Sequence, residues 1–162
     1  MMDLLVAHAG PELVHHRFPQ LDCGSTGARR LTLVGATLLH VAAEFGNPDA
    51  AALLLDRGAD VHAAALIDEN GIAGQPPIFH PVTQRAGDRG LAITKLLLER
   101  GAGLAVRAKL PGHYERPNEI VECTPLGYAL RFPGEDLPNA ATIELLRAHG
   151  ARYREVEATG LK

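Results

Sequence analysis

Residues 35–63 read GATLLHVAAEFGNPDAAALLLDRGADVHA, and this stretch contains two short helical patterns with separate start and stop signals. The first pattern begins at Thr37, whose hydroxyl can accept a hydrogen bond from a free backbone N–H, and ends at Gly46, which tolerates a left-handed backbone. The second begins at Pro48, because proline loses nothing at the first helical position, and ends at Gly58. Isolated helices below about 12–15 residues are marginal in water, so both helices must pack on neighbours.

The same stretch resembles an ankyrin repeat, whose pattern is G-x-T-P-L-H-x-A-A-x-x-G, then a second helix, then L-L-L-x-x-G-A-D-V-N-A. The matching positions are Gly35, Thr37, Leu39, His40, Ala42, Ala43, Gly46, Leu53 to Leu55, Gly58 to Val61, and Ala63. The sequence departs from the pattern at Leu38, where the family prefers proline, and at His62, where it prefers asparagine. The resemblance implies that His40 forms hydrogen bonds within and between repeats.

Two weaker copies of the pattern follow. The second copy starts at Gly74 and closes with residues 96–102, but Pro81 lies inside its first helix and lacks an N–H, so the last turn of that helix is expected to be disrupted. The third copy opens with residues 124–129, TPLGYA, and closes with residues 145–151. Both copies have longer turns between their helices, at residues 86–90 and 133–138.

The connections between copies are longer than those of a regular array of about 33 residues per repeat. Alternating apolar and polar residues at 104–110 and 119–123 predict a β-hairpin around a tip at 111–117, and we call residues 104–123 the long finger. A short finger turns at residues 68–71, where Asn-Gly is a favourable tight-turn pair. A third hairpin is expected to turn at residues 23–27 and to return on residues 30–34.

The first 34 residues match the pattern only loosely. We interpret them as a degenerate capping repeat with helices at 3–8 and 11–18, because Glu12-Leu13-Val14 continues helically. Phe18 then meets Pro19, which disfavours helix at the residue before it. In an alternative interpretation, residues 4–8 are the tail of a truncated repeat, since LLVAH resembles LLRAH at 145–149.

The predicted fold is therefore all-α, an ankyrin-repeat α-solenoid of helix–turn–helix units with extended β-hairpin-like fingers between them. Residues 1–162 are expected to form a single domain, with a cap at 1–34, repeats at 35–73, 74–121 and 122–151, and a polar tail at 152–162.

Composition limits the classes of function. The net charge of −3 gives no general attraction to nucleic acid or to anionic membranes. No apolar run approaches the roughly 20 residues needed to cross a bilayer, and the N-terminal MMDLL carries an acid where a signal peptide carries bases. The two cysteines, Cys23 and Cys123, lack metal spacing and are too few for a disulfide scaffold. These features predict a cytoplasmic protein with reduced thiols.

No catalytic or metal-binding pattern is present. The eight histidines include His15 and His16, which are adjacent and point to different helix faces, unlike the i, i+4 pair of a zinc helix. No nucleophile motif occurs, and the polar groups at the tip of the long finger would lie in water, without the burial that tunes catalytic pKa values. We therefore expect no catalysis, no cofactor and no metal; a small enzyme or metal-binding protein that uses the histidine-rich N-terminus is the less favoured alternative.

Recognition of a partner protein fits the sequence better, because tyrosine and arginine are enriched at binding hot spots. At the tip of the long finger the candidate residues are His113, Tyr114, Glu115 and Arg116, and at the short finger they are Asp68, Glu69 and Asn70. The alternatives are that the long finger is a solvated insertion without a partner, or that the protein associates with itself. The expected state is a monomer or a weak homo-oligomer.

The resemblance implies a second recognition surface. In T-P-L-H-x-A-A-x-x-G, the two variable positions before the glycine line a concave groove in this family and are not needed to hold the fold. They correspond to Glu44, Phe45, Thr83, Gln84, Arg131 and Phe132. The sequence leaves open whether Phe45 and Phe132 are half-buried against the next repeat or presented to a ligand.

Overall fold

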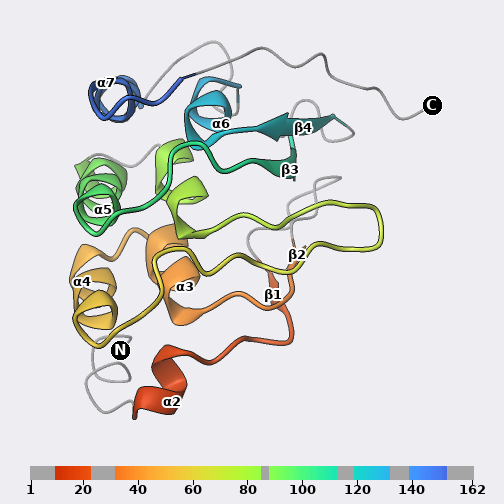
Figure 1. Cartoon of the computed structure of the whole chain (residues 1–162), viewed down its shortest axis with the longest axis vertical. Helices are drawn as coiled ribbons and strands as arrows, with labels where there is room; N and C mark the ends of the chain where they lie inside the picture. Colours follow the sequence, from red (N-terminus) through yellow and green to blue (C-terminus); the bar gives the residue numbers. More distant parts are fainter. Residues whose placement is uncertain (1–9, 23–31, 85–87, 113–118, 132–138, 153–162) are drawn as a thin grey trace.

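The computed structural model describes residues 10–22, 32–84, 88–112, 119–131 and 139–152. Its helices stand in two columns, with hairpins projecting from one side (Figure 1). The α-helices are α2 (Pro11–Val14), α3 (Leu38–Glu44), α4 (Pro48–Asp56), α5 (Asp88–Glu99), α6 (Pro125–Arg131) and α7 (Ala140–Ala148). Two 3-10 turns, η1 (Pro77–Phe79) and η2 (Pro81–Thr83), and four strands, β1 (Leu21–Asp22), β2 (Thr32–Leu33), β3 (Ala108–Pro111) and β4 (Ile120–Cys123), complete the described elements.

The helices form three successive layers: α3 with α4, the 3-10 turns with α5, and α6 with α7. The outer column is α4, α5 and α7, each in contact with the next, and the inner column is α3, η1 with η2, and α6. One continuous apolar core runs through these layers, and a smaller cluster of Leu33, Ala36, Ala65 and Ala73 lies at the roots of the fingers.

The first layer is built as its local signals predict. Thr37 caps α3, and the backbone N–H of Thr37 donates to Nδ1 of His40 at 3.0 Å. The side chain of Asn47 caps α4 by accepting from the N–H of Ala50 at 3.0 Å, and Pro48 stands at the first helical position. The apolar faces of both helices are buried, as in the fully buried Leu39. The helix–turn–helix prediction is therefore confirmed for residues 37–58.

The three outer helices end in the same way. Gly58, Gly101 and Gly150 have φ values of +87°, +87° and +84°. Each glycine N–H donates three residues back at 2.9–3.0 Å, and the N–H of the alanine that follows donates five residues back at 2.9–3.0 Å. Glycine adopts this left-handed conformation without the steric cost of a Cβ, so the sequence repeat of Gly-Ala becomes a repeat in backbone geometry.

The inner half of the second layer differs from the expected single helix. It consists of the two 3-10 turns η1 and η2, because Pro81 has no N–H to donate to the carbonyl of Pro77 and its ring clashes there. The disruption predicted at Pro81 is thus larger than one turn. The following helix also begins earlier than expected: Asp88, Arg89 and Gly90 belong to α5 rather than to a loop.

Gly90 has a packing role in α5. A Cβ at this position would lie 2.6 Å from the carbonyl oxygen of Pro81, closer than side-chain carbons approach backbone oxygens. The absence of a side chain lets α5 pack directly against η2, so the outer helix of this layer is held close to an inner half that is not a regular helix.

The N-terminal helix is shorter than predicted. Only Pro11–Val14 is helical. The prediction of helix as far as Phe18 is wrong because Phe18 pairs instead with the start of the next layer: its N–H donates to the carbonyl of Ala36, and its carbonyl accepts from the N–H of Gly35, both at 2.8 Å. The expected helix at residues 3–8 lies outside the described residues.

The hairpins are antiparallel, and neighbouring hairpins are hydrogen-bonded to one another. In the long finger, β3 pairs with β4 from Ala108 opposite Cys123 to Pro111 opposite Ile120, so its strands are shorter than the predicted 104–110 and 119–123. The N-terminal hairpin pairs β1 with β2. The N–H of Leu66 donates to the carbonyl of Val34, and that of Ala73 to the carbonyl of Lys109, both at 2.8 Å. The short finger is therefore joined to the hairpins on both sides.

Thr124 stands before α6, and its hydroxyl accepts a hydrogen bond from the N–H of Gly127 at 3.3 Å. Replacing Thr124 by Ala should lower the free energy of unfolding by about 1 kcal/mol, since loss of an N-cap leaves a helical N–H without its acceptor. Chemical denaturation measures this loss. Thr124→Ser keeps the hydroxyl and should stay close to wild type; equal losses in both variants would mean that the methyl group, not the cap, matters.

None of the helices among the described residues combines the length and the hydrophobicity that a membrane-spanning segment requires.

Candidate partner-binding surface

The candidate residues fall into three groups in the structure. His113, Tyr114, Glu115, Arg116 and Phe132 lie outside the described residues, so the tip of the long finger stays a prediction. Asp68, Glu69 and Asn70 are exposed at the turn of the short finger. Glu44, Phe45, Thr83, Gln84 and Arg131 lie at the ends of the inner-column elements α3, η2 and α6.

The turn of the short finger is held by one carboxylate. Oδ1 of Asp68 accepts from the N–H groups of Asn70 at 2.9 Å and Ile72 at 2.8 Å. The N–H of Asp68 in turn donates to the carbonyl of Ile72 at 2.9 Å. A turn with this many internal hydrogen bonds is pre-organised, which reduces the ordering cost when a partner binds to it.

Glu44 joins the first layer to the second. Its Oε2 lies 2.6 Å from Nδ1 of His80, whose side chain is almost fully buried, while the Glu44 side chain is 30% exposed. The expectation that the two variable positions take no part in holding the fold is therefore wrong at Glu44. Sequence spacing could not show this, because the partner is 36 residues away.

Gln84 makes a second connection between the same layers. Its Nε2 donates to the carbonyls of Ala43, at 2.5 Å, and Glu44, at 2.8 Å. These carbonyls lie in the last turn of α3, where a helix has no internal donors for them. Thr83 is used locally, since its hydroxyl donates to the carbonyl of His80 at 3.2 Å. The expectation that the variable positions are not needed to hold the fold is therefore wrong at Gln84 as well.

Replacing Gln84 by Ala should lower the free energy of unfolding by about 1–2 kcal/mol, because two helix-end carbonyls lose their donor. Urea denaturation gives the size of the loss. Gln20→Ala is the matched control, since Gln20 is exposed, and it should change stability little. A Gln84→Ala protein as stable as the control would show that water replaces the amide without cost.

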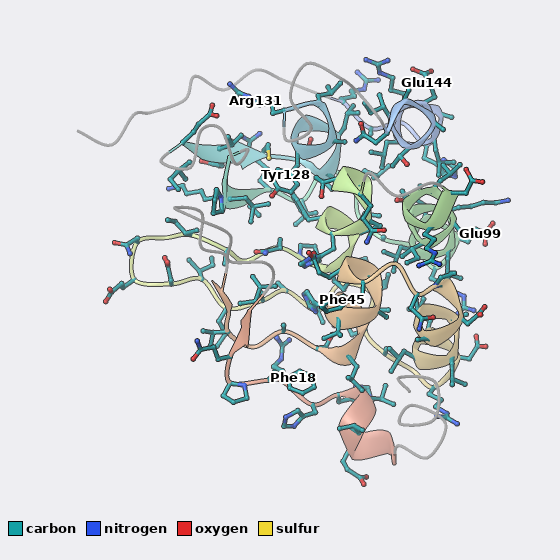
Figure 2. All side chains as sticks on the ribbon, turned by 180° about the vertical axis from the view of Figure 1, so that it is seen from behind. Phe18, Phe45, Glu99, Tyr128, Arg131 and Glu144 are labelled. Atoms are coloured by element: carbon teal, nitrogen blue, oxygen red, sulfur yellow. The ribbon has the colours of Figure 1, made fainter. Side chains whose placement is uncertain are left out.

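Phe45 has the opposite environment to its neighbour Glu44. Its side chain is 65% exposed at the end of α3, so it is not half-buried against the next repeat, and its presentation to a ligand stays a prediction. Figure 2 shows Phe45 at α3, in the inner column of helices. Among the described groove positions Phe45 is the most exposed apolar side chain. Large aromatic side chains are costly to leave in water and are enriched at binding hot spots.

Arg131 connects the last layer to the long finger. Its guanidinium lies 3.7 Å from the carboxylate of Glu119, next to β4, and the Arg131 side chain is half-buried. Arg131 therefore contributes to positioning the finger relative to α6, besides offering a charge at the surface.

His40 has the structural role that the ankyrin resemblance implies. Nδ1 accepts from Thr37, within the layer, and Nε2 lies 3.2 Å from the carbonyl of Gln75, which belongs to the next layer. Burial, and then the nearby His80, lower the pKa of His40 to about 3. The ring is thus neutral at physiological pH and serves as a fixed hydrogen-bonding bridge.

Two features of the structure were not predicted from the sequence. Asn139 is buried, and its Nδ2 donates to the carbonyls of Val82, at 2.5 Å, and Ala129, at 3.1 Å, which ties the second layer to the third. Its position before α7, like Asn47 before α4, was the available signal. Exposed aliphatic side chains on the fingers were also missed, although Leu66-Ile67 directly precedes the predicted turn.

Two observations bear on metal binding and nucleophilic chemistry in the described residues. Among them no three His, Cys, Asp or Glu side chains are placed to hold a metal ion together. Cys123 is a free, buried thiol, and burial raises its pKa to about 12, so it is protonated at neutral pH and is a poor nucleophile.

The helices α3 and α4, joined by a short turn that contains Gly46, form one helix–turn–helix unit. Residues 34–66, which contain this unit, match the model of the family described as Ankyrin repeat. The resemblance predicted from residues 35–63 is thereby confirmed.

A relative supports the comparison over a longer segment. The chain is 31% identical over 101 residues to the B-cell lymphoma 3 protein homolog of Mus musculus. The alignment covers 62% of this chain but only 20% of that protein. The chain thus matches about a fifth of the length of this relative.

Proposed function

We propose that this chain is a non-catalytic module that binds a partner protein through its inner helical face and the tips of its fingers. The family supports the coarse statement, since ankyrin repeats are protein–protein interaction units. The observation that carries the proposal is Phe45, an aromatic side chain left 65% exposed while the polar groups around it are occupied in joining layers. A partner side chain packed on Phe45 would remove this apolar surface from water.

We also propose that the ankyrin array continues beyond residues 34–66, with further repeats at 74–121 and 122–151, a cap at 1–34 and a tail at 152–162, all in one domain. The identical helix ends at Gly58, Gly101 and Gly150 support this extension. So does the pairing of each outer helix with the next. In such a stack each repeat buries its apolar faces on its neighbours, and specificity resides in the surface residues.

The proposed binding residues are Glu44, Phe45, Thr83, Gln84, Arg131 and Phe132 at the inner face, Asp68, Glu69 and Asn70 at the short finger, and His113, Tyr114, Glu115 and Arg116 at the long finger. Within this set Phe45 is the expected apolar anchor. Glu44 and Gln84 are expected to act mainly by holding the layers beneath it. We place the module in the cytoplasm on the sequence grounds given above.

Affinity capture from a lysate of the source cells tests the function. The wild-type protein is compared with Phe45→Ala, with the double variant Tyr114→Ala, Arg116→Ala, and with Lys95→Ala, an exposed change on the outer helix α5. A partner retained by wild type and by Lys95→Ala but lost with Phe45→Ala supports the inner face. A partner lost only with the double variant places the site on the long finger. Retention of no specific protein by any of the four would contradict the binding function.

A further inference from the structure

A cavity of about 550 Å³ opens where the chain leaves the outer helices α5 and α7. Residues of the two segments that follow these helices, 102–107 and 149–152, line it together with Thr124, which stands before α6. Both segments can be traced in Figure 1, in green after α5 and in blue after α7. Small-molecule sites commonly have volumes of roughly 300–1,000 Å³. None of the described residues that line the cavity belongs to the proposed partner-binding residues, so it is a separate candidate site.

Part of the cavity wall is apolar. Ala102 and Ala151 follow the glycines that end α5 and α7, and both alanine side chains are buried. Leu104, which is half-buried, packs against the main core and extends this wall. A Cβ on Gly150 would meet no atom within 4 Å, so the cavity is open beside this glycine. A wall of this kind favours the organic part of a ligand over a fully hydrated ion.

The polar part of the wall is basic. Arg107, His149 and Arg152 contribute basic groups, and among the described residues of the wall none carries a carboxylate. Glu122 pairs with Arg107 and offsets one positive charge, whereas Arg152 has no ion-pair partner among the described residues. A positive potential therefore remains at the cavity, and an anion is the complementary ligand.

Two of the basic groups are oriented by contacts within the protein. Nε of Arg107 donates to Oε1 of Glu122, and Nη2 donates to the carbonyl of Glu122, both at 3.2 Å. A guanidinium carries five N–H groups, so the others are left for a ligand. Nδ1 of His149 lies 2.9 Å from the carbonyl oxygen of Leu145, so Nδ1 carries the proton and Nε2 is left for a ligand. Groups that are already oriented lose little freedom on binding.

From this arrangement we propose that the cavity binds a small organic phosphate monoester, with the phosphate at the basic residues and the organic group on the apolar wall. A phosphate monoester has a charge of about −1.5 to −2 at neutral pH and three strong acceptor oxygens. Guanidinium groups bind such oxygens with paired N–H donors. The hydroxyl of Thr124, whose oxygen accepts from the N–H of Gly127 at 3.3 Å, keeps its own O–H as a further donor. A carboxylate, with two oxygens and a single charge, would use less of this donor set.

Titration of the purified chain with phenyl phosphate, followed by amide NMR shifts, tests the site. We expect a single site with a dissociation constant on the order of 0.1–1 mM, because the ligand is small and the cavity is open to solvent. The largest shifts should fall in segments 102–107 and 149–152. Inorganic phosphate and phenylacetate should each bind about tenfold more weakly, because the first lacks the organic group and the second has the smaller charge.

Variants with matched controls separate this site from a general effect of charge. Arg152→Gln removes a basic group, and Ala105→Glu adds a carboxylate at an exposed position of the cavity, so each should weaken phenyl phosphate binding about tenfold or more. The controls are Arg89→Gln and Ala92→Glu, which make the same changes at exposed positions near the start of α5, whereas the cavity lies beyond its end. Both controls should bind phenyl phosphate like wild type. The amide spectrum of each variant also reports whether it is folded.

Each contrary outcome overturns a defined part of the proposal. The absence of saturable shifts with phenyl phosphate up to about 10 mM overturns the site, and so does equal weakening in the variants and their controls. Phenylacetate that binds as tightly as phenyl phosphate overturns the assignment to a phosphate ester. A phosphotyrosine peptide that binds more tightly than phenyl phosphate through the same segments overturns the small-molecule assignment, since the ligand is then a phosphorylated protein. Partner capture through Phe45 can succeed or fail independently of all these results.

Discussion

Replacing Leu97 by Ala is expected to lower the free energy of unfolding by roughly 2–5 kcal/mol. Leu97 is fully buried in α5, the helix that lies between α4 and α7 in the outer column. The substitution removes its contacts and leaves a cavity that the neighbouring layers fill only in part. Because the chain has 162 residues, a loss of this size corresponds to a fall of about 10 °C in the thermal midpoint, which calorimetry measures directly.

Leu98→Ala is the matched control for this prediction. Leu98 is the next residue of the same helix and is only partly buried against the core, so its truncation should cost clearly less than that of Leu97. Equal losses in the two variants would mean that α5 is rotated from the orientation described. A loss at Leu97 below about 1 kcal/mol would mean that α5 is not clamped between two layers.

The first layer was predictable because its signals are local. Thr37, Asn47, Pro48 and the glycines that end the helices each act within a few residues of their own position. Such local effects are what sequence patterns record. The same holds for the turn of the short finger, where Asp68 bonds to N–H groups two and four residues away.

The second layer was harder to predict because two opposed rules meet there. The repeat pattern favours a helix after Pro77, whereas Pro81 cannot continue one. The structure resolves the conflict with two 3-10 turns, and Gly90 allows α5 to approach them closely. Which rule prevails depends on packing against α5, which the sequence of residues 77–83 does not contain.

The candidate surface was only partly predictable, since its contacts span long sequence separations. Glu44 pairs with His80 across 36 residues, and Gln84 reaches the end of α3 across 40 and 41 residues. A position that varies in a family can therefore still hold layers together in one member. The exposure of Leu66 and Ile67 was not predicted for a related reason, because it depends on how the short finger packs on the hairpins beside it.

Acid is expected to destabilise the protein through His40 below about pH 6.5. In the unfolded chain this histidine should bind a proton with the ordinary pKa of 6.5, whereas in the folded chain its pKa is lowered to about 3. Between these values the unfolded state binds more protons, so stability falls as the pH falls. The loss attributable to His40 is about 2 kcal/mol at pH 5 and about 4 kcal/mol at pH 3, and it is absent above about pH 7.

The comparison of wild type with His40→Gln isolates this effect from the titration of carboxylates. His40→Gln should be less stable than wild type at pH 7, because the ring bridges Thr37 and the carbonyl of Gln75, but its stability should fall less steeply between pH 6.5 and pH 4. The matched control is His62→Gln, since His62 is exposed, and it should follow the wild-type pH profile. Urea midpoints at each pH give the comparison. Parallel pH profiles for wild type and His40→Gln would show that His40 takes up its proton without disturbing the contact between the first and second layers. That result would conflict with the buried position of the ring, which also faces His80.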